Sequence, residues 1–217
     1  MESRSSRIEL RTEPRILGVL GGVASGKSAA ARFLAGEGGW VVSADEIVHK
    51  LLAEKDAIEA FSRRFGETVL GPNGGLDRAR LAQLVFDPEQ GAEARAALED
   101  WTHPRVRARI LARIEEARSE GVPRVVLDVP LLLETDAQSG LARLCHVLVF
   151  VAVSDEQRDQ RGREQRSWPA GEVARREAAQ LPLDEKMERA DYVLSNETTL
   201  EELEAACRHV LAQIEAD

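Results

Sequence analysis

Cysteine and long apolar runs are both scarce in this chain of 217 residues. The two cysteines, Cys145 and Cys207, stand far apart, so we expect neither a disulfide framework nor a cysteine-based zinc site, and the composition suits a reducing cytosol. The scattered histidines argue against a histidine metal cluster. No apolar run approaches the roughly 20 residues that span a bilayer, and residues 1–14 lack the apolar core of a secretory signal. We therefore expect a cytoplasmic protein without membrane contact, with a disordered tail over residues 1–14.

Positive charges are outnumbered by negative ones, with 29 Lys and Arg against 38 Asp and Glu. The formal net charge is −9, which argues against general nucleic-acid binding because that function needs a basic surface. Small anionic substrates remain possible, since a local cluster of cations can oppose the overall sign. Apolar residues make up 43% and charged residues 31%, as in an ordinary globular protein of one domain, or of one core with insertions.

Residues 21–28 read GGVASGKS, a complete G-x-x-x-x-G-K-[ST] phosphate loop between an apolar run and a helix-forming stretch. Its glycines let the backbone turn and bring N–H groups close to phosphate oxygens, and the following helix points its positive dipole end at the same anion. Lys27 can reach the β- and γ-phosphates, and the Ser28 hydroxyl is placed to ligate Mg²⁺. The alternative is a glycine-rich turn that binds nothing, which a lysine and a serine in register disfavour. We predict that a nucleoside triphosphate is bound by Gly21, Gly22, Ala24, Ser25, Gly26, Lys27, Ser28 and Ala29.

Five short β-branched runs predict strands, at residues 16–20, 40–42, 125–127, 147–151 and 192–194. Helical patterns separate most of them, which predicts right-handed βαβ units and an α/β fold with a parallel sheet. Ligands of such sheets bind beyond the carboxyl ends of the strands. The phosphate loop, Asp45 and Asp128 each follow or end a different strand, so we expect them at one crevice.

Two segments depart from this alternation. Residues 47–118 are strongly helical, broken by a turn at 71–75 and with Asp77 as an expected helix N-cap, which predicts a helical insertion. Residues 157–182 are rich in arginine and contain a turn at 168–171. They are either a solvated helix pair or a mobile lid whose arginines close over phosphates.

Phosphoryl transfer also needs a group that orients the attacking alcohol and accepts its proton. Asp45 is our candidate, and the alternative is that it caps the helix beginning at Glu46. Asp128 ends a buried strand, where a carboxylate is costly unless it is paired or near a metal, so we favour a site role such as a water-mediated Mg²⁺ contact. Glu134 has a weaker case because it can simply start the next helix. His103, which precedes Pro104, can be a packing or turn residue instead of a ligand.

Several motifs together resemble the dephospho-coenzyme A kinase family, over nearly all of the chain after the first 14 residues. In order along the chain, they are the phosphate loop, Ser43-Ala44-Asp45, Leu76-Asp77-Arg78, His103-Pro104, the segment DVPLLLE from Asp128 to Glu134, and the run from Gln180 to Asn196 that contains K-x-x-x-A-D-Y-V. The resemblance implies a three-layer P-loop kinase core with a five-stranded parallel sheet, a helical substrate-binding insertion and a helical lid. The implied reaction transfers the ATP γ-phosphate to the ribose 3′-hydroxyl of dephospho-coenzyme A. Its products are ADP and coenzyme A, and it is the last step of coenzyme A biosynthesis.

The resemblance also implies roles for particular residues. Asp45 would be the base that activates the 3′-hydroxyl, with Lys27 as the second catalytic residue and Mg²⁺ as the cofactor. The acceptor pocket would be formed by Asp45, His103, Asp128, Pro130, Leu131 and Glu134. The chain departs from the family in having Ala29 where a threonine is usual and Ser43 where an aspartate is frequent. The lid pattern Q-x-x-R-x-x-x-R is out of register: Gln157, Arg161 and Arg166 or Arg163 align with it only after a shift, and we expect ATP contacts from Arg161 and Arg166.

The predicted organisation is therefore a core of residues 15–46 and 119–217, with a lid at about 157–182 and an acceptor-binding insertion at 47–118. We expect ATP and dephospho-coenzyme A as partners and a monomer or weak homo-oligomer. One alternative is a nucleoside monophosphate or small-metabolite kinase on the same fold, since fold does not fix substrate. Another is a nucleotide-dependent regulatory switch, although the N-K-x-D motif that a GTPase needs for base recognition is absent.

Overall fold

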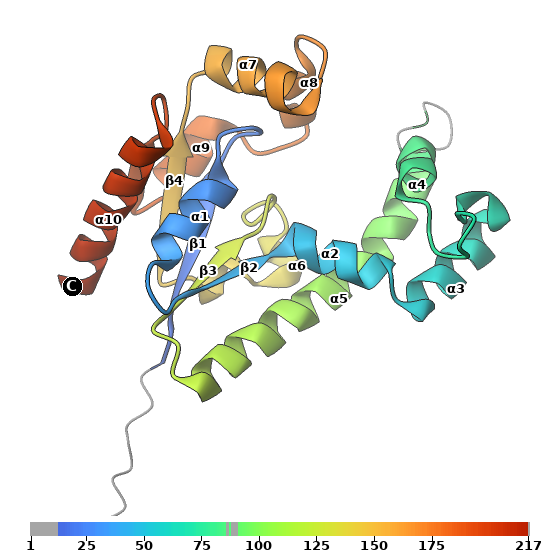
Figure 1. Ribbon diagram of the computed structural model, residues 1–217, viewed down its shortest axis with the longest axis horizontal. Coiled ribbons are helices and arrows are strands. Elements are labelled where there is room, and N and C mark those ends of the chain that lie inside the picture. Colours follow the sequence, from blue (N-terminus) through green and yellow to red (C-terminus); the bar gives the residue numbers. More distant parts are fainter. Residues whose placement is uncertain (1–12, 86, 88–90, 217) are drawn as a thin grey trace, which may run out of the picture. The chain divides into compact units, whose positions relative to one another are not determined.

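In the computed structural model, which describes residues 13–85, 87 and 91–216, five parallel strands form one sheet (Figure 1). The strands are β1 (Arg15–Gly21), β2 (Trp40–Ser43), β3 (Arg124–Asp128), β4 (Val147–Ala152) and β5 (Tyr192–Ser195). Their order across the sheet is β2-β3-β1-β4-β5. Each of the five predicted runs lies within one of these strands, and the predicted α/β class is confirmed.

Strand β1 lies inside the sheet and is paired on both sides. Leu17 is opposite Val126 of β3 and Val147 of β4. Because successive side chains point to opposite faces, Leu17 and Val19 enter one core while Gly18 faces the other. A Cβ atom at Gly18 would lie 2.7 Å from side-chain carbons of Leu132 and Leu148, so only glycine fits there. Burial on both faces explains why β1 reads as a continuous apolar run.

Helices cover both faces of this sheet. On the Leu17 face, α1 (Lys27–Ala35) and α10 (Leu200–Ala216) pack together, and Leu34 and Ile214 contribute to the core. The remaining elements of this part of the chain are α6 (Asp136–Ser139), η2 (Ala142–Leu144), α7 (Asp155–Arg166), α8 (Glu172–Glu177) and α9 (Leu183–Glu188). The predicted arginine-rich segment 157–182 contains most of α7 and all of α8.

The described chain divides into two compact units. The first combines the described residues of Met1–Val42 and Ala112–Asp217 and contains the sheet, and the second is Ser43–Leu111. The second unit holds α2 (Ala44–Leu52), α3 (Lys55–Phe65), η1 (Glu67–Val69), α4 (Arg78–Val85) and the first part of α5 (Gly91–Glu120). Its bounds differ from the expected insertion of 47–118. The reason is that α5 is one continuous helix that crosses from the second unit into the first, so no chain break marks the boundary.

The helical unit has a core of its own. Phe61 packs against Trp101 with ring centroids 5.3 Å apart, and Phe65 stacks on Phe61. Asp77 caps α4 as predicted, because its Oδ1 accepts hydrogen bonds from the amides of Ala79 and Arg80 at 3.0 and 3.2 Å. A separate apolar cluster of this kind is what allows the insertion to form a compact body.

The predicted tail falls mostly outside the described residues. Of residues 1–14, only Glu13 and Pro14 are described: the Glu13 carboxylate pairs with Arg118 at 2.7 Å, and Pro14 is buried. Within the described ranges, no helix combines the length and apolar character needed to cross a membrane.

Candidate active site

The phosphate loop connects β1 to α1, as its sequence predicts. Gly21 and Gly26 have φ angles of +147° and +88°, values that residues with a side chain rarely adopt. Ala24 also has a positive φ, of 60°. A Cβ at Gly26 would lie 2.4 Å from the side-chain nitrogen of Asn196. Both the backbone angle and the close neighbour therefore require glycine at position 26.

Lys27 begins α1, and its ammonium group turns back onto the loop. Nζ donates hydrogen bonds to the carbonyl oxygens of Gly21 at 3.1 Å and Gly22 at 2.6 Å. The residue as a whole keeps intermediate exposure, but protein atoms surround its charged end. This desolvation, followed by repulsion from Lys186, lowers the pKa of Lys27 to about 8. A phosphate group would favour the charged form and reverse the shift.

Two residues outside the loop sequence support the loop. Asn196, which follows β5 and is buried, donates from its amide nitrogen to the Ser25 carbonyl at 2.8 Å. Arg161 of α7 donates to the Asn196 carbonyl at 2.7 Å and to the Gln157 side chain at 3.0 Å. Asn196 therefore connects Arg161, one of the two predicted lid arginines, to the phosphate loop.

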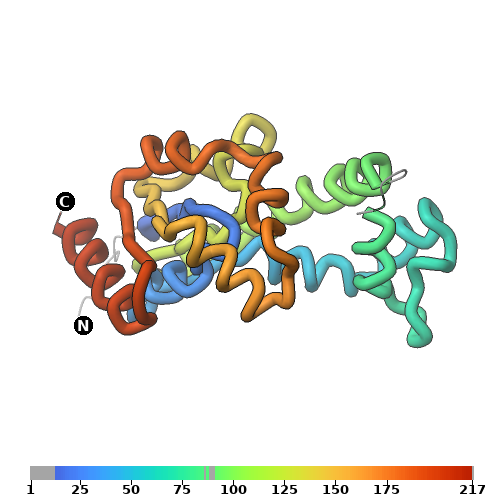
Figure 2. Tube along the Cα trace, turned by 90° about the horizontal axis from the view of Figure 1, so that it is seen from above, coloured from blue at the N-terminus to red at the C-terminus, as the bar shows by residue number. Residues whose placement is uncertain are grey.

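The arginines of α7 have different environments. Arg158 is 2% exposed and pairs with Asp155 and Glu177, so the solvated interpretation is wrong for this residue. Arg166 is exposed and stacks over the Trp168 ring at 4.8 Å, close enough to Lys27 to contribute to lowering its pKa. Figures 1 and 2 show α7 and α8 (orange) passing over the loop that follows β1 (blue).

A second group of predicted site residues, Asp128, Pro130, Leu131 and Glu134, lies in the first unit, at the end of β3 and just after it. Asp128, the last residue of β3, is 7% exposed, and its negative charge opposes the lowering of the Lys27 pKa. Pro130 is exposed and Leu131 is partly exposed. Glu134 does not start a helix, because α6 begins at Asp136.

Instead, Glu134 forms a buried ion pair. Its carboxylate lies 2.7 Å from Nζ of Lys186, which is 2% exposed, and accepts a 3.2 Å hydrogen bond from the Leu181 amide. Lys186 also donates to Gln180 at 2.9 Å. Glu134 thus connects the segment after β3 to α9, a structural task that its prediction as an acceptor ligand did not include.

Asp45 and His103 belong to the helical unit. Asp45 is exposed in the first turn of α2 and does not cap it, because Ser43 accepts the capping hydrogen bond from Glu46 at 3.3 Å. The helix-capping alternative for Asp45 is therefore wrong. His103 is exposed within α5, so the packing or turn alternative is wrong as well.

Two oxygen groups of the first unit fit a magnesium ion held mainly by phosphates. Mg²⁺ in kinase sites takes one or two protein oxygens and completes its shell with phosphate oxygens and water. Ser28 is exposed in the first turn of α1, and Asp128 carries the buried carboxylate at the end of β3. Among the described residues, no cluster of three or more His, Cys, Asp or Glu could hold a metal by itself.

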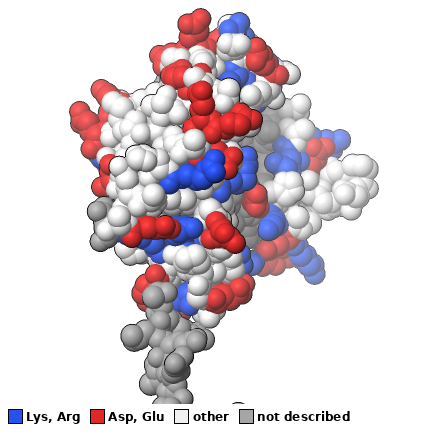
Figure 3. Space-filling model, turned by 60° about the vertical axis from the view of Figure 1, so that its left-hand side comes forward, with Lys and Arg blue, Asp and Glu red and all other residues white. Residues whose placement is uncertain are grey.

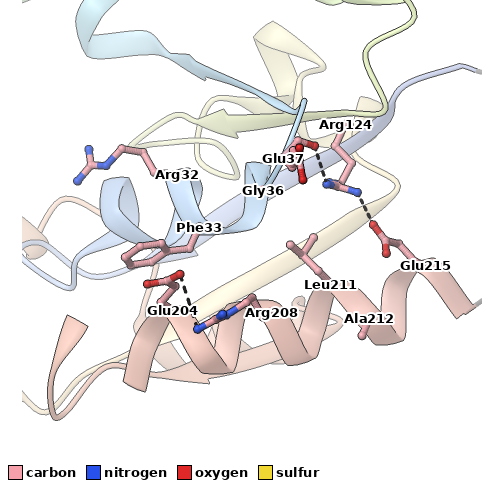
Figure 4. A pocket seen from close by; sticks show the side chains of 10 residues that line it. All are labelled: Arg32, Phe33, Gly36, Glu37, Arg124, Glu204, Arg208, Leu211, Ala212 and Glu215. Carbon is pink, nitrogen blue, oxygen red and sulfur yellow. Dashed lines mark hydrogen bonds and ion pairs between the residues drawn. The ribbon is translucent and has the colours of Figure 1, made fainter. Parts of the chain in front are cut away.

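A cavity of about 640 Å³ lies elsewhere, between α1 and α10 (Figure 4). It contains none of the predicted site residues, and four of its charged residues form two ion pairs, Arg124 with Glu215 and Arg208 with Glu204 at 3.7 Å. On the face drawn in Figure 3, basic and acidic side chains are likewise intermingled. The phosphate loop, with the cations around it, remains the candidate site.

Comparisons with known proteins identify the family to which the chain belongs. A family model described as dephospho-CoA kinase matches residues 15–202. A dephospho-CoA kinase from Corynebacterium glutamicum is 37% identical over 199 residues, covering 91% of this chain and 96% of that protein. Another from Symbiobacterium thermophilum is 42% identical over 200 residues, covering 89% and 80%.

Solved structures give the same fold. TT1252 from Thermus thermophilus has a TM-score of 0.73 and 36% identity, covering 94% of this chain and 99% of that one. A dephospho-CoA kinase from Campylobacter jejuni has a TM-score of 0.65 at 23% identity, covering 94% and 98%. A shikimate kinase from Acinetobacter baumannii, at 13% identity and a TM-score of 0.53, also has this fold.

Proposed function

The chain belongs to the dephospho-CoA kinase family, and on that premise we propose that it transfers the γ-phosphate of ATP to the ribose 3′-hydroxyl of dephospho-coenzyme A. The products are ADP and coenzyme A, and the reaction is the final step of coenzyme A biosynthesis. The observation that carries the proposal is the complete phosphate loop, with Lys27 at the start of α1, in a chain of this family. We assign the reaction to the cytoplasm.

Phosphoryl transfer is catalysed mainly by positioning and by stabilising negative charge. We assign the triphosphate to the loop amides and the N-terminal end of α1, where Lys27 can exchange its hydrogen bonds to the loop carbonyls for phosphate oxygens. Arg161 and Arg166 supply further positive charge from α7. Mg²⁺, when bound with ATP, neutralises developing charge on the phosphates, and Ser28 and Asp128 are the residues that we expect to hold it.

The acceptor needs an alcohol held in line with the γ-phosphate and a group that takes its proton. We assign the proton to the Asp45 carboxylate and acceptor binding to the helical unit Ser43–Leu111 together with Asp128, Pro130 and Leu131. His103 is included as an acceptor contact because it is exposed on α5. We assign Glu134 an indirect part in acceptor binding, through its ion pair with Lys186.

An ADP-release assay with a panel of acceptors tests this function. We expect turnover with dephospho-coenzyme A and Mg²⁺, and loss of turnover when the metal is chelated. Turnover with a nucleoside monophosphate, and none above background with dephospho-coenzyme A, would contradict the acceptor and favour a different kinase on the same fold. Slow hydrolysis without any acceptor would favour a nucleotide-dependent switch.

A further inference from the structure

A carboxylate from outside the phosphate loop binds one of the loop's own amides. Oε1 of Glu177, the last residue of α8, accepts a hydrogen bond from the Val23 N–H at 2.6 Å. The same oxygen accepts from Nη1 of Arg158 in α7. A Cβ at Gly22 would lie 2.5 Å from this oxygen and 2.6 Å from Arg158 Nη1, so both groups lie directly against the loop.

Burial makes this contact more costly to break than a surface ion pair. The side chain of Glu177 is 17% exposed and that of Arg158 is 3% exposed, whereas Asp155, the other partner of Arg158, is 94% exposed. A guanidinium group removed from water needs an anion close to it. Glu177 is the buried anion of this pair, and its Oε1 accepts hydrogen bonds from both Arg158 and the Val23 amide.

A carboxylate oxygen and a phosphate oxygen present the same chemistry to these donors, because both are anionic acceptors of backbone N–H and arginine hydrogen bonds. A triphosphate in the loop would bring its negative charge against the Glu177 carboxylate. Two anions cannot share the Val23 amide and the Arg158 guanidinium without repulsion.

We propose that Glu177 is an internal competitor for the phosphate loop, whose carboxylate exchanges with a phosphate oxygen of the triphosphate for the Val23 amide and the Arg158 guanidinium. This inference rests on the proposed function, in which the loop binds ATP. Because Glu177 ends α8 and Arg158 lies in α7, the exchange releases the α8 end from the loop and makes the arginine available to the phosphates. Glu177 acts as a positioning residue in this scheme.

The first test measures nucleotide affinity by calorimetry on the full chain, with ADP and a non-hydrolysable ATP analogue in the presence of Mg²⁺. Glu177→Gln keeps the size of the side chain and removes the repulsion, so we expect about tenfold tighter binding, with a smaller gain at high salt. Glu172→Gln is the matched control: Glu172 is also in α8, but it pairs with Arg175 at 2.7 Å and Arg176 at 2.8 Å. Unchanged or weaker binding by Glu177→Gln would overturn the proposal.

A second measurement separates exchange from a structural role. With Glu177 neutral, Arg158 loses its enclosed partner and we expect lower stability to urea, but the loss should be smaller when nucleotide saturates the protein. An equal loss in both conditions would mean that Glu177 only maintains the fold. If Glu177→Gln does not fold, the variants Arg158→Met and Arg158→Met/Glu177→Met replace it. We expect the double variant to bind nucleotide more tightly than Arg158→Met alone, because it also lacks the competing carboxylate. Equal or weaker binding by the double variant would contradict the exchange.

The wild-type protein in the same series distinguishes this inference from the proposed function. Wild-type turnover with dephospho-coenzyme A, combined with unaltered affinity in Glu177→Gln, would refute only the competitor role. Absence of nucleotide binding by the wild-type protein would refute the proposed function itself.

Discussion

The position of Lys27 and its pKa have different origins. Its position in the loop follows from the sequence motif, but its pKa follows from burial and from Lys186, which lies 159 positions away in the chain (186 − 27). An ammonium group that burial has removed from water gains more from an incoming anion than a solvated one does. Asp45 is the contrasting case, an exposed carboxylate whose expected role depends on the acceptor.

Nucleotide binding should therefore take up a proton at Lys27. Because the pKa of Lys27 is lowered from 10.5 to about 8, the unfolded chain binds more protons at this residue between these values, and its contribution to stability rises with pH across that window. Phosphate raises the pKa again, so we expect proton uptake near pH 8.5 and little at pH 7. Calorimetry in two buffers of different ionisation enthalpy measures it, and equal heats in both buffers at pH 8.5 would contradict the expectation.

Removal of the Lys27 side chain tests the loop assignment. Lys27→Ala should greatly reduce phosphoryl transfer in the ADP-release assay, because the phosphates lose a positioning cation. Lys55→Ala is the control, since Lys55 is an exposed lysine paired with Glu59 at 3.6 Å. Wild-type activity in Lys27→Ala would refute the assignment.

Asp45→Asn should lower turnover by roughly 10²–10⁴-fold while nucleotide affinity stays close to that of the wild type. The amide keeps the shape of the side chain but cannot accept the proton of the acceptor hydroxyl. Steady-state kinetics and nucleotide titration check both parts. Glu46→Gln, one residue further along the same exposed turn, is the control, and equal turnover in the two variants would remove Asp45 from the proposed role.

At the scale of elements, short hydrogen-bonded connections hold the site together. The segment after β3 and helix α9 are joined by the Glu134–Lys186 pair, and β5 supports the phosphate loop through Asn196. Helix α2 begins at Ala44, two residues before the Glu46 start that an Asp45 cap would give, because Ser43 is the capping residue. The capping residue ends β2, so strand and helix follow each other without a linker.

Glu134→Gln should destabilise the protein by about 3 kcal/mol, because it leaves the buried Lys186 ammonium without its counter-charge. Urea denaturation measures the change. Glu185→Gln is the control, since Glu185 pairs with Arg189 at the surface, and an exposed pair contributes about 0.5 kcal/mol or less. A loss of the same small size in both variants would show that the buried pair contributes no more than the surface one.

At the scale of the whole molecule, the described residues form two units connected through α5 and the β2–α2 junction. Each unit has its own apolar core, the first around β1 and α1 and the second around Phe61. Two compact bodies with separate cores are suited to binding two substrates, which is why we assign ATP to the first and the acceptor mainly to the second.

Hydrogen exchange should separate the two substrates. We expect ATP with Mg²⁺ to slow amide exchange in residues 21–29 and in α7 and α8, and dephospho-coenzyme A to slow exchange within residues 43–111. Substrate contacts exclude water and hold the local backbone, so protection should follow the binding surface. Protection of the same peptides by both substrates, with none in 43–111, would contradict the assignment of the acceptor to the helical unit.

Local patterns in the sequence were sufficient for several features. The five strands, the phosphate loop, the Asp77 cap and the α7–α8 pair all depend on residue types within a few positions of one another, which set backbone angles, burial pattern and turns. The tertiary structure decided the pairings between distant segments: Glu134 with Lys186, and Glu177 with Val23 across 154 positions. Such pairs leave no local pattern, because charge and hydrogen-bonding capacity are properties of single residues, whereas the partner is chosen by how the sheet and helices bring the chain together.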